Sequence, residues 1–290
     1  MPFPRNAPGR QAGQRTSDEP AEPAGDPVAA VGTLPADTLR TRPSRVAAII
    51  PAKDEARRIM ATVRAVRAIP GVDLVLVVDD GSEDETQHVA RAAGAVVVRH
   101  SHNRGRAAAM ETGAAVVAMR DVPDRGPRSL LFLAADLGES AVAVAPLVTP
   151  VVDGTADMTV ALLSPGSSPG GHGWVIAAAR RAVAQLTGWT PSAPLSRLRC
   201  LTREAYEAAT PLARGDGVEP AMTIDLLRAG YRVVEVPVEL RHHPAGNSLR
   251  VQARRAAGYR DVELALSARR ARAAAEAARD RLDPRKHAGR

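Results

Sequence analysis

Two apolar segments of this sequence end in acidic residues. Residues 74–86 read LVLVVDDGSEDET, so two adjacent carboxylates, Asp79 and Asp80, follow a run of aliphatic side chains. Residues 130–140 read LLFLAADLGES, so a single carboxylate, Asp136, follows a similar run. In open parallel α/β sheets, ligands bind outside the carboxyl ends of the strands. The two segments therefore predict a site for a cation and a phosphorylated ligand.

The residues after Asp80 also have a purely structural interpretation. Ser82 and Glu85 fit the S-x-x-E pattern of a helix capping box, and Gly81 permits a tight turn. Neither feature explains the two adjacent acids, which repel each other unless a hydrogen-bond donor or a cation meets them. We therefore favour a ligand-binding interpretation of this turn.

Strand and helix patterns alternate around these acids, which predicts parallel βαβ units. In the first half, strands are predicted at 46–50, 72–78, 95–98 and 129–133, with helices at 55–69, 84–93 and 104–119. In the second half, strands are predicted at 158–163, 199–202 and 231–240, with helices at 174–186 and 219–229, a loop at 164–173, and a long helix from Leu249 to about Leu282 that is interrupted at Gly258.

Composition narrows the class of protein. A chain of 290 residues suits one large domain or two small ones, and 45% apolar residues suffice for a core. Its lysines are Lys53 and Lys286, and no glycine-rich loop ends in Gly-Lys-Ser/Thr, which argues against a P-loop NTPase and against a Schiff-base lysine. The single cysteine, Cys200, fits a reducing cytoplasm.

Charge and hydropathy indicate a cytoplasmic protein. No apolar segment of a secretory signal is visible, and the longest apolar run, 141–152, is well short of the roughly 20 residues that span a bilayer.

Nearly all of the net charge of +7 lies in residues 251–290, which hold ten Arg and one Lys against five acids. We expect this part to be mainly a solvated helix and tail, without a nucleic-acid partner.

Four motifs together resemble a GT-A glycosyltransferase of the family 2 type, similar also to the glucosyl-3-phosphoglycerate synthase group. They are IPAKDE at 50–55, DDGSEDET at 79–86, NRGR at 103–106 followed by the helix to Gly113, and GVE at 217–219. The resemblance implies an α/β fold with a doubly wound mixed sheet and a C-terminal helix. It also implies transfer of a hexose from a nucleoside diphosphate sugar to a hydroxyl or phosphate acceptor, with Mg or Mn.

The resemblance also assigns residues to the donor. It places five of them near the base and ribose of the nucleotide: Pro51, Ala52, Glu55, Asp80 and Ser82. Arg106 stands where the family has lysine, and an arginine can still neutralise a diphosphate. The alternative for Arg106 is a solvated helix residue.

The metal ligands depart from the family pattern. Where the family has Asp-x-Asp, this chain has Ala134, Ala135 and Asp136, so Asp136 alone keeps the metal-binding position. In the phosphoglycerate-type relatives a histidine completes the metal site, and His242 or His243 could correspond to it. The alternative for these histidines is a surface pair in a loop.

An acceptor-side acid is expected near the GVE motif. Asp216 or Glu219 could take the proton of the acceptor hydroxyl, as an inverting transferase requires. Glu219 also suits the first turn of a helix through the helix dipole alone.

The sequence also bears on two other classes of protein. Ala134 favours a catalytically weak GT-A-fold protein that binds a nucleotide or a partner. A nucleotidyltransferase would usually show a glycine-rich basic motif after the first strand, and PAKDE at 51–55 is not such a motif. The acceptor could be small or lipid-linked.

The sequence divides into a disordered tail (1–44), a GT-A domain (45–250) and a basic C-terminal helix and tail (251–290). Residues up to about Leu266 are expected to pack on the domain. Residues 267–290 are expected to make at most weak, salt-sensitive peripheral contact with anionic membranes.

Deleting residues 1–44 should leave the melting temperature nearly unchanged, because this segment lacks core-forming periodicity. Calorimetry of the truncated and full chains checks this. A drop of several degrees would mean that the segment packs on the domain, since ~1 kcal/mol moves the midpoint by roughly 2–4 °C for chains of 150–250 residues.

Overall fold

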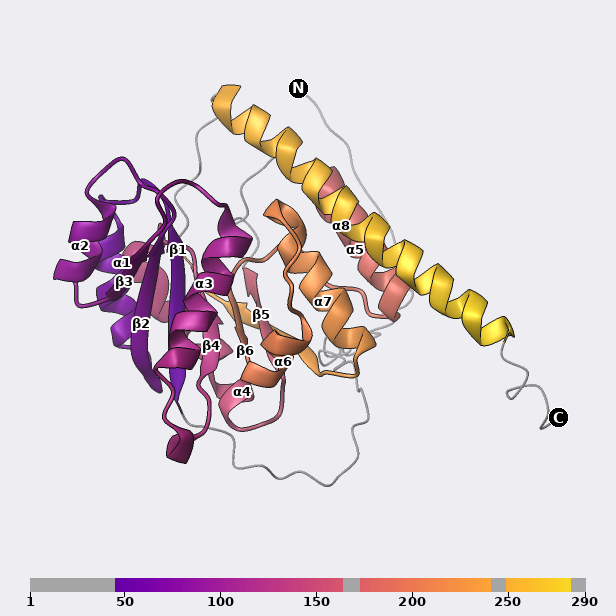
Figure 1. The fold of residues 1–290 in the computed structure, drawn as a ribbon, viewed down its shortest axis with the longest axis horizontal. Helices are drawn as coiled ribbons and strands as arrows, with labels where there is room; N and C mark the ends of the chain where they lie inside the picture. The colour runs from indigo at the N-terminus through magenta and orange to yellow at the C-terminus, as the bar shows by residue number, and fades with distance from the viewer. Residues whose placement is uncertain (1–44, 164–172, 241–248, 283–290) are drawn as a thin grey trace, which may run out of the picture.

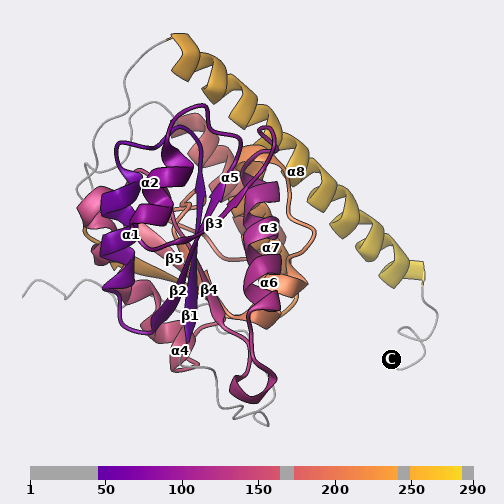
Figure 2. The same cartoon turned by 60° about the vertical axis from the view of Figure 1, so that its left-hand side comes forward.

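The computed structural model describes residues 45–163, 173–240 and 249–282, and the predicted tail 1–44 lies outside them. A mixed sheet is flanked by helices on both faces (Figures 1 and 2). The strands are β1 (Val46–Ala52), β2 (Val72–Asp79), β3 (Val96–Arg99), β4 (Ser129–Phe132), β5 (Met158–Leu163), β6 (Arg199–Leu201) and β7 (Val233–Val238). The helices are α1 (Ile59–Arg67), α2 (Thr86–Ala92), α3 (Arg106–Met119), α4 (Thr149–Val152), α5 (Gly173–Thr187), α6 (Arg203–Ala208), α7 (Val218–Arg228) and α8 (Leu249–Leu282), with 3₁₀ segments η1 (Pro123–Arg125), η2 (Gly138–Leu147) and η3 (Gly215–Gly217).

The strand order is β3-β2-β1-β4-β6-β5-β7. Strands β1 to β4 are parallel to one another, β5 is parallel to β7, and β6 runs antiparallel between β4 and β5. The alternation of helices and strands predicted parallel units only, whereas the mixed sheet agrees with the resemblance. Because β1, β2 and β4 are parallel neighbours, their carboxyl ends lie at one edge of the sheet, which places 50–56, 79–86 and 133–138 there.

Alternate residues of β1 pack on opposite faces of the sheet. Ala48 and Ile50 join the core beneath α1 and η2, while Ala47 and Ile49 join the core beneath α3, α6 and α7. Helix α3 lies so close to β1 that a Cβ on Gly113 would come within 2.5 Å of the Ile49 side chain. This close contact fixes α3, whose first residue is Arg106, against the sheet.

The segment η2 was not predicted as an element of structure. A 3₁₀ helix has three residues per turn, so residues three apart share a face. The three residues with this spacing, Ala141, Val144 and Leu147, are all completely buried against the core. The sequence contained this period, but a search for periods of 2 and 3.6 misses it.

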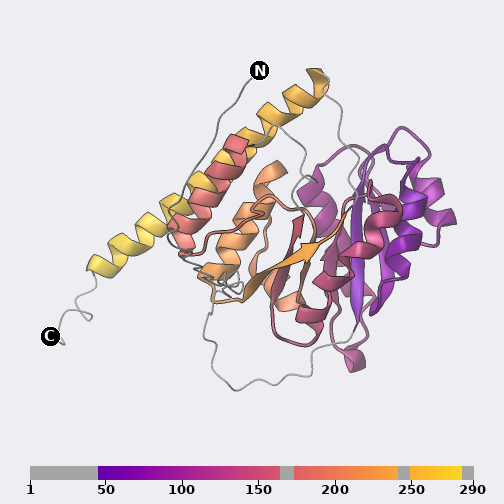
Figure 3. The same ribbon diagram turned by 180° about the vertical axis from the view of Figure 1, so that it is seen from behind.

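Helix α8 is continuous through Gly258, so the predicted interruption there is wrong. It lies beside α5 and then extends past the domain (Figures 1 and 3). Val262 and Leu266 are completely buried against α5 and α7. A Cβ on Gly217 would come within 2.7 Å of the Ala265 Cβ, so α8 lies directly over η3. None of the described helices is long and apolar enough to cross a bilayer.

Leu266→Ala should lower the free energy of unfolding by about 2–5 kcal/mol, because it removes a completely buried side chain between α8, α5 and α7. Leu264→Ala is the matched control, since Leu264 lies in the same helix and is 59% exposed. Chemical denaturation measures both variants. Equal losses would show that burial of Leu266 does not stabilise the domain.

Candidate functional site

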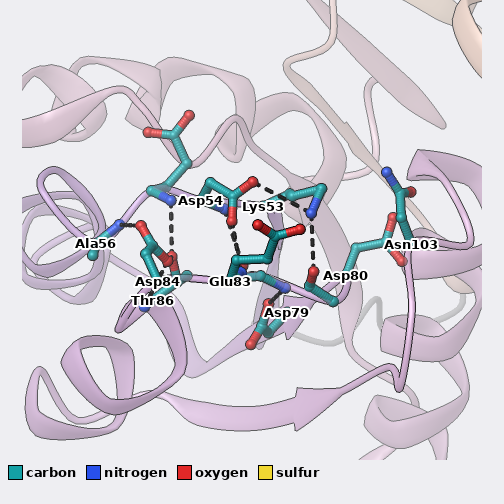
Figure 4. Close-up of polar contacts among 12 residues, drawn as sticks. Lys53, Asp54, Ala56, Asp79, Asp80, Glu83, Asp84, Thr86 and Asn103 are labelled. Carbon is teal, nitrogen blue, oxygen red and sulfur yellow. Dashed lines mark hydrogen bonds and ion pairs between the residues drawn. The ribbon is translucent and has the colours of Figure 1, made fainter.

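The loop after β1 is hydrogen-bonded to the turn after β2 through side chains of both segments (Figure 4). The amide of Asp54 donates to Ser82 Oγ at 3.0 Å, and the amide of Glu55 donates to Thr86 Oγ1 at 2.8 Å. In the reverse direction, the amide of Glu83 donates to Asp54 Oδ1 at 2.8 Å. Asp54 has a φ of 55°, a left-handed conformation that Asp and Asn tolerate better than most residues. The two segments therefore form one preorganised unit.

Two further contacts hold this unit. Lys53 Nζ donates to the carbonyl of Gly81 at 2.9 Å and lies 3.3 Å from Asp54 Oδ2. The amide of Ala56 donates to Asp84 Oδ2 at 3.0 Å (Figure 4). Lys53 thus forms an ion pair with Asp54 and a hydrogen bond to the Gly81 carbonyl, both within the unit.

The adjacent acids Asp79 and Asp80 are both met by donors from the protein. Asp79 Oδ1 accepts from the amide of Ser82 at 2.9 Å, and Asp79 Oδ2 lies 3.6 Å from Arg99 Nε. Asp80 accepts from the amides of Arg104 and Gly105, both at 2.8 Å. Protein donors therefore meet much of this negative charge, while Asp79 Oδ2 is buried and makes no hydrogen bond within the described residues.

Asp80 also forms a buried pair with His100. The distance from Asp80 Oδ1 to His100 Nδ1 is 2.7 Å, and His100 Nε2 lies 3.0 Å from Thr112 Oγ1 of α3. Burial works against the charge of Asp80, but the hydrogen bonds from Arg104, His100 and Gly105 outweigh it and lower the pKa of this carboxyl. Asp80 therefore fixes the segment that leads into α3.

Asp136 projects outward at the end of β4, between the buried residues Ala135 and Leu137. Its Oδ2 lies 3.5 Å from Nη1 of Arg58, and the two side chains are 48% and 53% exposed. The pKa of Glu55 is raised, first by partial burial and then by the charge of Asp136. The charges of Glu55 and Asp136 therefore interact across the edge of the sheet.

A second charged cluster joins the start of α3 to the start of α7. Arg106 Nε donates to Glu219 Oε1 at 3.0 Å, and Arg106 Nη2 donates to the carbonyl of Arg197 at 3.0 Å. Burial lowers the pKa of Arg106, although the charge of Glu219 opposes this shift. Glu219 itself is only 2% exposed. The Arg106 side chain is only 15% exposed and is held by Glu219 and the Arg197 carbonyl, which does not fit a freely solvated helix residue.

Arg197 belongs to this cluster and was missed from sequence. Its Nη2 donates to Asp216 Oδ1 at 2.7 Å. Its side chain is 53% exposed, and although partial desolvation opposes its charge, the carboxylates of Glu219 and Asp216, with a smaller contribution from Asp136, raise the pKa of Arg197. Arg197 therefore belongs to the same charged cluster as Asp216 and Glu219. It lies in no motif that could have drawn attention to it.

Arg199 lies behind the cluster and is completely buried. Its Nη1 donates to Thr223 Oγ1 at 2.8 Å, and its Nε donates to the carbonyl of Ser196 at 2.8 Å. Burial lowers the pKa of Arg199 to about 10, and Glu219 is the foremost charge that opposes the shift. Glu219 is thus a counter-ion that Arg106 and Arg199 share.

The predicted nucleotide residues lie together, and the histidines are not described. Pro51 and Ala52 end β1, and Ala52 pairs with Asp79 while its carbonyl accepts from the amide of Asp80 at 2.8 Å. Ser82 lies in the turn opposite them. His242 and His243 lie outside the described residues.

The donors at Asp136 fit a cation only in part. No group of three or more His, Cys, Asp or Glu among the described residues could hold a metal. Mg²⁺ is usually held by one or two carboxylates together with substrate phosphates and water. Asp136 is one such carboxylate at the carboxyl end of β4.

Comparisons with known proteins agree with this geometry. Residues 47–170 match the model of the family described as glycosyl transferase family 2. A segment of 65 residues is 38% identical to an uncharacterized protein of Methanocaldococcus jannaschii, and this covers 22% of this chain and 26% of that relative. The chain thus matches about a quarter of the length of that curated relative.

Solved structures extend the similarity to the fold. Glucosyl-3-phosphoglycerate synthase from Mycobacterium tuberculosis with phosphoglyceric acid superimposes with a TM-score of 0.63 at 24% identity, over 78% of this chain and 79% of that chain. Its complex with Mn²⁺, UDP-glucose and phosphoglyceric acid gives 0.62 at 24% identity over the same shares. Its complex with Mg²⁺ and UDP gives 0.61 at 22% identity over 78% and 79%. This chain therefore has the GT-A glycosyltransferase fold, and its resemblance to family 2 is confirmed.

Asp80→Asn should destabilise the protein by about 1.5–3 kcal/mol at neutral pH, because it replaces a charged acceptor of buried hydrogen bonds. A lowered pKa stabilises the fold above the unfolded value, which is ordinarily near 3.8, and this stabilisation is lost as pH falls through the folded pKa. The difference in melting temperature between wild type and variant should therefore shrink below about pH 4.

Thermal melts across this range test the effect of Asp80. Asp124→Asn, a change at an exposed acid of η1, is the control and should leave the melts unchanged. A constant difference between wild type and Asp80→Asn at every pH would contradict the assignment of charge to Asp80.

Proposed function

We propose that this chain transfers a hexose from a nucleoside diphosphate sugar to a hydroxyl or phosphate of an acceptor, with Mg or Mn bound at Asp136. The observation that carries the proposal is the position of Asp136. It projects from the carboxyl end of β4 beside the preorganised unit of loop 50–56 and turn 79–86. The family 2 match spans all three segments, which supports a donor site at this edge.

The nucleoside end of the donor would lie against the preorganised unit. Pro51, Ala52, Glu55 and Ser82 are proposed to contact base and ribose directly. Asp80 is proposed to act differently, because its buried carboxylate is occupied by the amides of Arg104 and Gly105. Asp80 would instead fix the segment that leads into α3, next to the proposed position of the diphosphate.

The diphosphate would be neutralised from two sides. A cation held at Asp136 would supply positive charge that offsets the charge of the diphosphate and of the departing nucleotide. Arg106 and Arg197 would supply positive charge from the opposite side, and fixed charges that need no reorganisation are effective in catalysis. Glu219 would keep Arg106 in place through the 3.0 Å bond.

The acceptor-side base is proposed to be Asp216 rather than Glu219. Asp216 is partly exposed and pairs with Arg197, whereas Glu219 is almost completely buried and shared among arginines. A base must come within hydrogen-bond reach of the acceptor hydroxyl, directly or through one water. Both residues stay candidates, and His242 and His243 stay proposed second ligands of the metal.

A small acceptor is favoured over a lipid-linked one. The similar structures hold phosphoglyceric acid or glucosyl-3-phosphoglycerate, and no described helix could span a bilayer. We therefore propose a cytoplasmic enzyme of residues 45–250 with the α8 region as support, and at most weak peripheral contact with membranes.

The second candidate is a catalytically weak GT-A-fold protein that binds a nucleotide or a partner. Two observations favour it. Ala134 offers no oxygen where the family has an acid, and Arg58 lies 3.5 Å from Asp136, where it competes with a cation. A panel of nucleotide sugars tested for binding and for sugar release, with and without Mn²⁺, separates the two candidates.

Asp136→Ala should abolish Mn²⁺-dependent binding of UDP or GDP, because it removes the carboxylate in the metal-binding position. Ala134→Asp should strengthen this binding, since it restores a second acid. Isothermal calorimetry with and without Mn²⁺ measures both, with the exposed Asp124→Ala as control. Unchanged nucleotide affinity with Mn²⁺ in Asp136→Ala would refute the metal assignment.

A further inference from the structure

Thr62 lies in α1 and is completely buried. Its Oγ1 donates to the carbonyl of Ala135 at 2.8 Å and accepts from the amide of Gly138 at 2.8 Å. These two backbone groups lie on either side of Asp136 in the chain. One side-chain hydroxyl therefore holds both ends of the short segment that presents the acid.

Other contacts also shape the segment, among them the Ser140 Oγ bond to the carbonyl of Leu137 at 2.6 Å. Strand β4 ends at Phe132, and Leu133 makes a last bond to the carbonyl of Ile49 at 3.2 Å. From there Ala135 and Leu137 turn into the core while Asp136 turns outward. Buried backbone groups need partners, and here a side chain of α1 supplies them.

Thr62 also connects this segment to the other charged groups of the edge. Arg58, one turn earlier, pairs with Asp136 at 3.5 Å, and the Thr62 Oγ1 lies 3.2 Å from the Arg58 carbonyl. Glu55 precedes both residues and belongs to the loop that the turn 79–86 holds. The hydroxyl thus links the nucleotide-side loop to the Asp136 segment.

We propose that Thr62 is a positioning residue: its hydroxyl fixes the segment 135–138, and thereby the Asp136 carboxylate, relative to the loop 53–56. What Asp136 does in that position rests on the proposed function, but the positioning itself does not. Groups that orient metal ligands typically change metal affinity by ~10–100-fold when they are removed.

The competing explanation is that the Thr62 hydroxyl only satisfies its own hydrogen-bonding capacity in the core and does not orient Asp136. Thr159 of β5 provides the comparison. It is also completely buried, and its Oγ1 donates to the carbonyl of Leu147 at 2.7 Å, with the carbonyl of Cys200 at 3.3 Å. It holds none of the residues assigned to the site.

The experiment compares three variants of the full chain. Thr62→Val removes the hydroxyl at nearly constant volume, Thr62→Ser keeps the hydroxyl, and Thr159→Val controls for the loss of a buried hydroxyl elsewhere. Hydrogen exchange of a peptide that spans residues 133–140 reports the segment directly, because the Gly138 amide is bonded to Thr62. Calorimetry with UDP, with and without Mn²⁺, reports the carboxylate.

Thr62→Val should accelerate exchange in 133–140 and weaken Mn²⁺-dependent UDP binding by ~10-fold or more, while UDP binding without Mn²⁺ stays unchanged. Thr62→Ser should restore both properties, and Thr159→Val should alter neither. In an Asp136→Ala background, Thr62→Val should cause no further loss of affinity.

Exchange in 133–140 that is equal in Thr62→Val and wild type would overturn the proposal, whatever the protein binds. If wild type binds UDP with Mn²⁺ and Thr62→Val binds it with equal affinity, the proposed connection between Thr62 and Asp136 is overturned. A wild type that binds no UDP with Mn²⁺ would instead sink the proposed function, and the exchange measurement would still decide whether Thr62 positions the segment. If Thr62→Val does not fold, Thr62→Ser decides: wild-type exchange and affinity support the proposal, and loss of either overturns it.

Discussion

The arrangement of this edge of the sheet depends on the cost of burying charge. Asp80 and Glu219 are buried carboxylates, and each must collect donors from segments distant in sequence. Asp80 gathers the amides that precede α3, and Glu219 holds the first residue of the same helix from the opposite side. The start of α3 is therefore fixed twice, and Arg106 is fixed with it. A fold that leaves either acid unpaired is strongly disfavoured.

The same constraint explains how so many arginines can lie together. Arg106, Arg197 and Arg199 lie around Glu219: Arg199 is buried, the Arg106 side chain is 15% exposed, and the Arg197 side chain is 53% exposed. Planar guanidinium groups can donate to several backbone carbonyls at once, which lets them enter the protein with fewer carboxylates than cations. The surplus positive charge suits an anion with several charged oxygens, such as a diphosphate.

Helix α8 adds a distant support to this arrangement. It packs directly on Gly217, two residues before Glu219, through Ala265. A side chain at position 217 would push α8 away or move the start of α7, so the glycine is needed for close packing rather than for a turn. The C-terminal helix thus helps to hold the acid that orients Arg106.

Local chemistry let the sequence predict much of the first half. Strands β2 and β4 and the acids that follow them were predicted from apolar runs that stop at Asp79 and Asp136. Strand β1 was predicted from the short apolar run before Pro51, and β5 was predicted with its observed ends. The unusual period of η2 and the reversed direction of β6 were missed, because a local pattern records neither a 3₁₀ repeat nor the direction of a neighbouring strand.

The residue types of the site were also visible in sequence, but their partners were not. Asp136 was identified from its place after a strand, whereas its contact with Arg58 and its dependence on Thr62 join segments about 75 residues apart. Sequence could not show that Arg106 meets Glu219 across 113 positions, or that Arg197 joins them. Sequence determined which groups could carry charge, because that is a property of each side chain. Tertiary structure decided which charges are buried together, because that depends on how parallel strands bring distant loops to one edge.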